Sequence, residues 1–126
     1  MKEKLVEILL KWLPSASRQG NIISWGTIYD GYEITLVYDM KENSYQYGIA
    51  IKCDKARFAA IENILGLNIK KYPNGFALSS ELGYNVILTE KEVKHRVDRM
   101  FMFVKMAIGK DTKWKDFSEL VEENRQ

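Results

Sequence analysis

The chain has 126 residues, a length typical of one domain, and its 46% hydrophobic and 29% charged residues are ordinary for a globular protein. This composition argues against a disordered chain, and a formal net charge of +2 is too small to indicate a polyanion partner by itself. The single cysteine, Cys53, excludes an internal disulfide and fits a reducing compartment.

The N-terminal residues do not have the pattern of a signal peptide, because Glu7 and Lys11 interrupt the apolar residues there. No stretch of the chain approaches the ~20 consecutive apolar residues that a membrane-spanning helix needs. We therefore expect one cytoplasmic domain over residues 1–126, with no membrane partner.

The first predicted element is a helix over residues 2–13. Its apolar side chains recur at helical spacing, at Leu5, Ile8, Leu9 and Trp12. Pro14 ends this helix, and residues 15–20 are predicted to form a polar connector.

Three antiparallel strands are predicted between residues 21 and 53. Asp30 and Gly31 stand between two runs of strand-forming residues, which is typical of a two-residue type I′ turn. A second turn over residues 41–44 gives a register consistent with the first, in which Trp25 lies opposite Leu36. The two registers place one set of residues on a shared apolar face: Ile23, Trp25, Tyr32, Ile34, Leu36, Tyr38, Tyr45, Tyr47, Ile49 and Ile51.

The other face of these strands carries small, weakly polar residues in two rows: Ser24, Val37 and Gly48, and then Gly26, Thr35 and Ala50. Two interpretations fit this pattern. The face is a plain solvated surface, or it is a docking surface that a partner strand, helix or ligand can approach closely.

Residues 54–88 are predicted to form a helix and then three short strands. Asp54 has the position of an N-cap for a helix over 55–65, with Gly66 beyond its end. Its inward residues are expected to be Phe58, Ile61 and Leu65. A turn at Pro73-Asn74-Gly75 and a break near Gly83 separate the strands. Alternation over residues 82–88 predicts the third strand: Leu82, Tyr84, Val86 and Leu88.

The C-terminal part is predicted to be helical. A capping box over residues 89–92 opens the longest helix, which runs to about Ile108 and ends at Gly109. A last helix is predicted over residues 112–124. The element order is therefore α-βββ-α-βββ-αα. We expect the α+β class, with an antiparallel sheet built from the three-stranded meander plus further short strands, and helices packed on one face.

The sequence offers little catalytic chemistry. One histidine and one cysteine cannot form a zinc cluster, and no glycine-rich phosphate loop or nucleophile elbow is present. His95 stands among basic residues and is expected to be solvated, and Cys53 is expected to be a buried and unreactive thiol. These observations favour a protein that is not an enzyme and that needs no metal and no cofactor.

The predicted long helix carries apolar residues on two sides. One stripe at helical spacing contains Val93, Val97, Met100, Phe101, Val104 and Ile108. Met102 and Met106 project from the opposite side, and Phe103 flanks them. In one interpretation the last helix folds back, so that Trp114 and Phe117 cover this patch. In the other, Met102, Phe103, Met106 and Trp114 form an interface with a protein partner or with a second copy of the chain.

Nucleic-acid binding is the alternative function. Residues 91–115 contain eight basic and three acidic residues, a net charge of +5. The expected phosphate contacts are Lys94, Arg96, Arg99 and Lys105, with the meander tyrosines as a base-stacking platform. Against this, basic residues are common late in helices, and the tyrosines share a face with core residues.

The sequence therefore favours a non-catalytic intracellular protein-interaction module: a regulator, an inhibitor or a chaperone-like adaptor that dimerises or binds a protein partner. The nucleic-acid-binding module is the second hypothesis. An enzyme whose carboxylates and tyrosines assemble only in three dimensions is the third.

Overall fold

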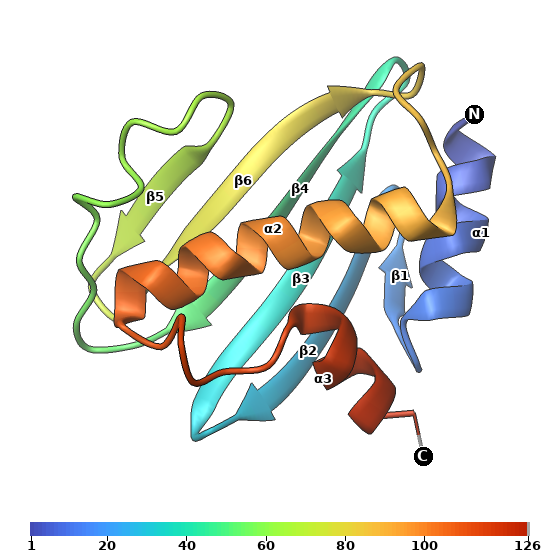
Figure 1. Cartoon of the computed structure of the whole chain (residues 1–126). Helices are drawn as coiled ribbons and strands as arrows, with labels where there is room; N and C mark the ends of the chain where they lie inside the picture. Colours follow the sequence, from blue (N-terminus) through green and yellow to red (C-terminus); the bar gives the residue numbers. More distant parts are fainter. Residues whose placement is uncertain (126) are drawn as a thin grey trace.

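The computed structural model describes residues 1–125 (Figure 1). Within this range the chain forms six antiparallel strands and three α-helices, joined by loops and turns. The helices are α1 (Lys2–Trp12), α2 (Glu90–Ile108) and α3 (Phe117–Glu123). The strands are β1 (Ser17–Gln19), β2 (Ile22–Tyr29), β3 (Tyr32–Met40), β4 (Ser44–Lys52), β5 (Asn68–Tyr72) and β6 (Gly75–Gly83). They lie in the order β1-β2-β3-β4-β6-β5. The α+β class, with an antiparallel sheet and helices on one face, is confirmed.

The predicted register of the meander is also confirmed. Trp25 pairs with Leu36 across β2 and β3, and Tyr38 pairs with Tyr47 across β3 and β4. The turn between β2 and β3 has positive φ at both central residues, 51° at Asp30 and 81° at Gly31, as a type I′ turn requires. The register follows from this turn, because each later pair is fixed once the first is set.

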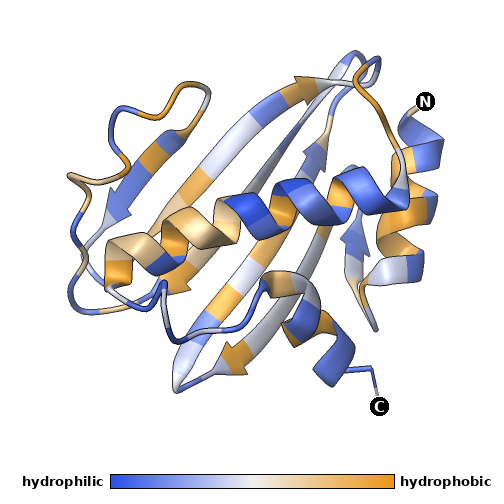
Figure 2. Ribbon diagram, in the orientation of Figure 1, coloured by the Kyte–Doolittle hydropathy of each residue, from blue (hydrophilic) through white to orange (hydrophobic). Residues whose placement is uncertain are grey.

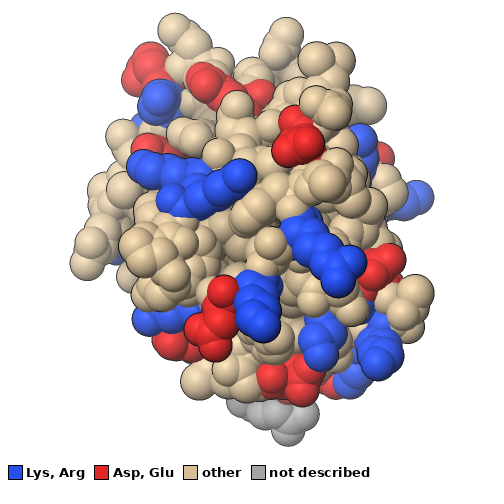
Figure 3. Space-filling view, turned by 90° about the vertical axis from the view of Figure 1, so that its left-hand side faces the viewer, with Lys and Arg blue, Asp and Glu red and all other residues tan. Residues whose placement is uncertain are grey.

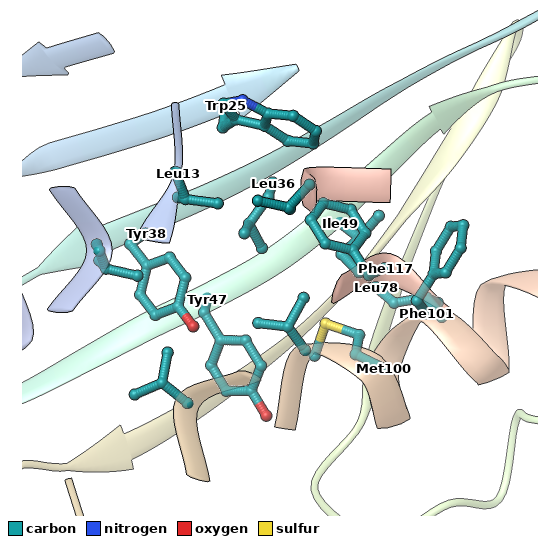
Figure 4. Packing of buried hydrophobic residues seen from close by; sticks show 14 of the residues in the cluster. Leu13, Trp25, Leu36, Tyr38, Tyr47, Ile49, Leu78, Met100, Phe101 and Phe117 are labelled. Carbon is teal, nitrogen blue, oxygen red and sulfur yellow. The ribbon is translucent and has the colours of Figure 1, made fainter. Parts of the chain in front are cut away.

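The hydrophobic core lies between the inner face of the sheet and the helices (Figure 4). α2 crosses this face, α1 stands at the N-terminal end of α2, and α3 lies beside it over β2 and β3 (Figure 1). The Phe117 ring joins these elements, with its centroid 5.6 Å from that of Trp25 and 5.4 Å from that of Phe101. Such edge-to-face pairs are favourable beyond the area that they bury.

The outer face of the sheet is not covered by a helix within residues 1–125 (Figure 1). One of its small residues, Gly48, has an explanation inside the fold. A Cβ atom at Gly48 would lie 2.6 Å from the carbonyl oxygen of Leu78, so β6 itself approaches too closely for any side chain. The close approach at Gly48 is therefore made by the neighbouring strand. The docking role of this face stays a prediction.

The predicted helix over residues 55–65 is wrong, because residues 53–67 form turns and irregular backbone instead. Backbone groups of this segment bond to other elements. The N–H of Cys53 donates to Asn74 and that of Arg57 donates to Ala107, at 3.0 and 2.7 Å. Local bonds in this segment form only isolated turns, such as that from the N–H of Glu62 to the carbonyl oxygen of Phe58 at 2.9 Å. Leu65, predicted to point inward, is 98% exposed.

Three smaller differences occur elsewhere. The predicted connector over residues 15–20 contains β1, which pairs with β2. The third late strand is absent from the described residues: after β6 the chain turns, and the Tyr84 hydroxyl donates to the carbonyl oxygen of Lys41 at 2.7 Å. α3 begins at Phe117 rather than at residue 112, because Asp116 forms its N-terminal capping box.

Candidate interaction surface

The helix α2 presents two flanks of different character. Its covered flank faces α3 and carries Phe101 and Lys105, which are buried. Its open flank faces β5 and residues 53–67, and carries Phe103 and Met106, which are half-buried. Figure 2 shows hydrophobic residues over much of the C-terminal half of α2, whereas its N-terminal half is hydrophilic on the side toward the viewer. The hydrophobic residues on the visible side of this helix are therefore concentrated in its C-terminal half.

Local sequence signals define the ends of α2. The Thr89 side chain accepts a hydrogen bond from the N–H of Glu92 at 3.2 Å, as a helix N-cap does. Gly109 ends the helix with φ of 74°, a left-handed conformation that glycine adopts without steric cost. Both ends agree with the prediction. The rotation of the helix is set by its buried apolar stripe, which includes Val93, Val97 and Val104 and packs on the sheet.

Trp114 lies on the covered side of α2. Its ring stacks on Phe101 with 6.1 Å between centroids, and Tyr29 and Tyr32 meet it edge-on. The indole N–H donates to the Asp30 carboxylate at 3.0 Å. The structure thus separates Trp114 from the other three residues of the expected interface. The loop after α2 covers Phe101 and leaves the open flank uncovered.

Of the remaining three residues of that set, Phe103 shares a cavity with Leu65, which the sequence did not indicate, whereas Met106 lines a different cleft and Met102 lines neither. Met102 is 37% exposed and is followed by the half-buried Phe103. Phe103 and Leu65 line the same small cavity between α2 and residues 64–67. We call Leu65, Met102, Phe103 and Met106 the α2–loop surface. Leu65 was missed because the apolar spacing of residues 58–65 resembles that of a helix with Leu65 inside.

Cationic side chains border the α2–loop surface. The cavity beneath Leu65 is also lined by His95, Arg96 and Arg99. The Arg99 guanidinium lies 5.1 Å from the centroid of the Phe103 ring, within cation–π range. One guanidinium nitrogen of Arg96 is buried and has no hydrogen-bond partner among the described residues. Burying one nitrogen without a partner is unfavourable, whereas the rest of the Arg96 side chain is half-buried and lines the cavity.

The residues expected to contact nucleic acid do not form one surface. Arg96 and Arg99 lie at this cavity, whereas Lys94 is 3.5 Å from Glu90 in an ion pair along the helix. Lys105 is only 2% exposed, and its ammonium group lies 3.4 Å from the carbonyl oxygen of Lys115 and 3.5 Å from that of Trp114. Lys105 is therefore enclosed by the loop before α3, away from any phosphate.

The meander tyrosines lie in the core rather than on a stacking platform. The rings of Tyr38 and Tyr47 stack on each other at 5.6 Å, and Tyr45 lies beside both. Burial raises the pKa of all three phenols, well above the usual value for Tyr38, and the charge of Arg96 partly opposes this shift. These hydroxyls stay protonated at neutral pH, and they support the packing of α2 on the sheet.

The two residues considered for catalysis, His95 and Cys53, lie in different surroundings. Within residues 1–125, no group of three or more His, Cys, Asp and Glu side chains could hold a metal ion. His95 is exposed. Burial and the nearby Asp54 charge raise the pKa of the half-buried Cys53 thiol, so that it is a weak nucleophile at neutral pH. None of the described helices combines the length and the apolar character that crossing a bilayer requires.

No protein-family model matches the chain, and no curated protein gives a significant match.

Proposed function

We propose that this chain is a non-catalytic protein-interaction module, acting as a regulator, an inhibitor or a chaperone-like adaptor inside the cell. The observation that carries the proposal is Leu65, which is 98% exposed beside the half-buried Phe103. If a partner removes this leucine side chain from water, the burial contributes about 1.5–3 kcal/mol to the free energy of binding. Aromatic residues, methionine and arginine are enriched at interface centres, and Phe103, Met102 and Arg99 supply them here. The free thiol of Cys53 supports the intracellular setting.

The partner that fits this surface is an acidic, apolar segment of another protein. His95, Arg96 and Arg99 border the apolar residues, so carboxylates on the partner would complement them. A symmetric dimer through the same surface would set these cations of one copy against those of the other. That arrangement is unfavourable, and we therefore prefer a different chain as the partner over a second copy.

The test is selection of random peptides displayed on phage against the purified protein. We expect the selected peptides to be enriched in Leu or Phe next to Asp or Glu, and to bind more weakly as salt concentration rises. The double variant Leu65→Ser with Met102→Ser should lose this binding. The matched control is Ile28→Ser with Ile87→Ser, which removes two apolar side chains exposed to 73% and 65% elsewhere on the molecule.

Two results would overturn the proposal. One is binding that survives in the Leu65→Ser, Met102→Ser variant, or that is lost equally in the control. The other is a wild-type dimer in sedimentation experiments that this double variant converts to a monomer, since the surface would then be occupied by a second copy.

Nucleic-acid binding is the second candidate function, and it has less support. Two of its four expected contacts remain available at the cavity beneath Leu65, namely Arg96 and Arg99. Figure 3 shows lysine and arginine side chains interspersed with carboxylates on the β5 side, without one continuous basic surface. We expect at most weak and salt-sensitive binding, with dissociation constants on the order of 10⁻⁴ to 10⁻⁶ M.

A further inference from the structure

A cleft of about 920 Å³ lies where the C-terminal end of α2, residues 53–58 and the turn between β5 and β6 meet. Ligand sites for small molecules typically have volumes of about 300–1,000 Å³. The cleft shares only Met106 with the α2–loop surface, and it lies outside the function proposed above.

The walls of this cleft are fixed even though one of them is irregular. The N–H of Cys53 donates to the carbonyl oxygen of Asn74 at 3.0 Å, and the N–H of Arg57 donates to that of Ala107 at 2.7 Å. These bonds tie the wall to the turn after β5 and to the end of α2. The Phe58 ring then packs edge-on against the buried Phe76, with 5.1 Å between centroids. A cleft held in this way is largely preformed, which lowers the entropic cost of binding.

The charges of the cleft are unbalanced. Lys55, Arg57 and Lys71 line it, and none of them forms an ion pair with another residue of the range 1–125. One carboxylate, that of Asp54, also lines it. By contrast, Lys52, which directly precedes Cys53 at the end of β4, forms an ion pair with Glu33 at 3.3 Å. Three cations without an ion-pair partner among the described residues thus line one cavity.

An apolar floor lies among these cations. Phe58, Phe76 and Met106 line the cleft, and the Lys71 ammonium group lies 4.5 Å from the centroid of the Phe58 ring. This contact holds Lys71 over the floor by a cation–π interaction. Its charge therefore faces the same space as the ring, so a bound molecule could meet both at once.

We propose that this cleft binds a small organic anion with a flat apolar body, such as an aryl carboxylate or an aryl phosphate. Arg57, Lys55 and Lys71 hold the anionic group, and the apolar body packs on Phe58 and Met106. Arg57 supplies the planar, two-pronged donor that suits carboxylates and phosphates, and the two lysines act as point charges. The Cys53 thiol lies at the wall of the site without taking part in binding.

The single cysteine makes this site directly measurable. Phenyl phosphate is titrated into the full chain, and the rate at which iodoacetamide alkylates Cys53 is followed by mass spectrometry. We expect a saturable decrease of this rate at neutral pH, together with a rise in melting temperature, because the ligand covers the thiol and binds only the folded state. Inorganic phosphate and phenol, which each supply half of the ligand, should protect Cys53 much less at equal concentration and ionic strength.

Two neighbouring lysines of β5 provide a matched pair of variants. Lys71 lies opposite Phe76 on the inner face and lines the cleft, whereas Lys70 lies opposite Ala77 on the outer face. Lys71→Gln should weaken phenyl phosphate binding about tenfold, the effect of losing one charge-assisted contact. Lys70→Gln removes the same charge and should leave the affinity unchanged. Both residues are exposed, so both variants should fold.

Three outcomes would overturn the proposal. The first is alkylation of Cys53 that does not change at any phenyl phosphate concentration up to the millimolar range. The second is an equal loss of affinity in the two lysine variants, which would indicate attraction by net charge alone. The third is equal protection by inorganic phosphate, which would remove the role of the apolar floor.

Discussion

The two flanks of α2 belong to the same helix and carry similar apolar residues, yet they end in different surroundings. On the covered flank, α3 begins with a capping box at Asp116 and is tied to α2 by hydrogen bonds from Ser118 to Asp98 at 2.6 and 2.8 Å. On the open flank, residues 53–67 form turns without a regular element. α3 and the loop before it lie against the first flank, whereas the turns leave cavities and an exposed leucine along the second.

We expect the covered flank to contribute mainly to the stability of the fold and the open flank mainly to binding. The covered flank is where side chains are fully removed from water and where their loss is costly. The open flank retains apolar area and unpaired cations that contribute little to folding, and it is therefore free to bind other molecules. Substitutions matched across the two flanks can test this division.

The largest effect on stability is expected from truncating Phe117, a residue of α3 that packs against the covered flank of α2. Phe117 is fully buried and contacts the rings of Trp12, Trp25 and Phe101. Phe117→Ala should lower the free energy of unfolding by about 3–5 kcal/mol in urea titrations, because it leaves a cavity among these rings. Phe103→Ala on the half-buried open flank should cost about 1 kcal/mol. Equal costs for the two variants would contradict the distinction between the flanks.

The next effect concerns the buried Lys105. Its ammonium group lies 3.5 Å from the Asp116 carboxylate and also faces the carbonyl oxygens of Trp114 and Lys115. Lys105→Met should lower the free energy of unfolding by about 1–3 kcal/mol, since it leaves these oxygens without their donor. Lys94→Met is the control.

That control tests a different kind of ion pair. Lys94 and Glu90 are both partly exposed, and surface pairs along a helix contribute no more than about 0.5 kcal/mol. A Lys105→Met variant as stable as Lys94→Met would show that the buried ammonium group does not hold the loop before α3 in place.

A third effect comes from the tyrosines beneath the N-terminal half of α2. Burial raises the pKa of Tyr38, Tyr45 and Tyr47 in the folded state. Below the usual tyrosine pKa of about 10, both states are protonated and the stability is fully present. Above it the unfolded chain loses protons that the folded chain keeps, so the free energy of unfolding falls by about 1.4 kcal/mol per pH unit for each such tyrosine.

Tyr38→Phe should make this alkaline slope shallower, because the phenylalanine has no proton to lose. The measurement is a series of urea titrations between about pH 8 and pH 11, where this loss develops. Tyr72→Phe is the control, because Tyr72 is 46% exposed. A Tyr38→Phe slope that matches the wild-type slope would place the phenol of Tyr38 in water.

The sequence predicted the parts of the fold that local signals determine. The Asp30-Gly31 turn and strict alternation were enough for the register of β2, β3 and β4, which is confirmed at each predicted pair. Thr89 and Gly109 likewise marked the two ends of α2. In these places, each residue's local preference agrees with its surroundings in the folded chain.

The sequence failed where distant segments decide the structure. Residues 53–58 bond to Ala107 and Asn74, and neither partner can be read from the spacing that predicted a helix over 55–65. In the sequence, Lys105 resembles Arg96 and Arg99, which are basic residues of the same helix. Its enclosure depends on the chain returning at Trp114, which the helix sequence does not reveal. The cleft was missed for the same reason, since its walls come from three separate segments.

The smallest effect on stability should accompany a large effect on binding, at Leu65. This side chain is 98% exposed, so Leu65→Ser should change the free energy of unfolding by less than about 0.5 kcal/mol.

If the α2–loop surface binds a partner segment as proposed, Leu65 lies at the centre of the contact. Removing a leucine side chain that is buried in the complex should cost about 1.5–3 kcal/mol of binding free energy, roughly a 10- to 150-fold loss of affinity. The measurement pairs urea unfolding with titration of a peptide selected against the wild-type protein. Ile28→Ser, at a position that is 73% exposed on the outer face of the sheet, should change neither quantity. A Leu65→Ser variant with unchanged peptide affinity would mean that the exposed leucine is only a by-product of the turn before Gly66.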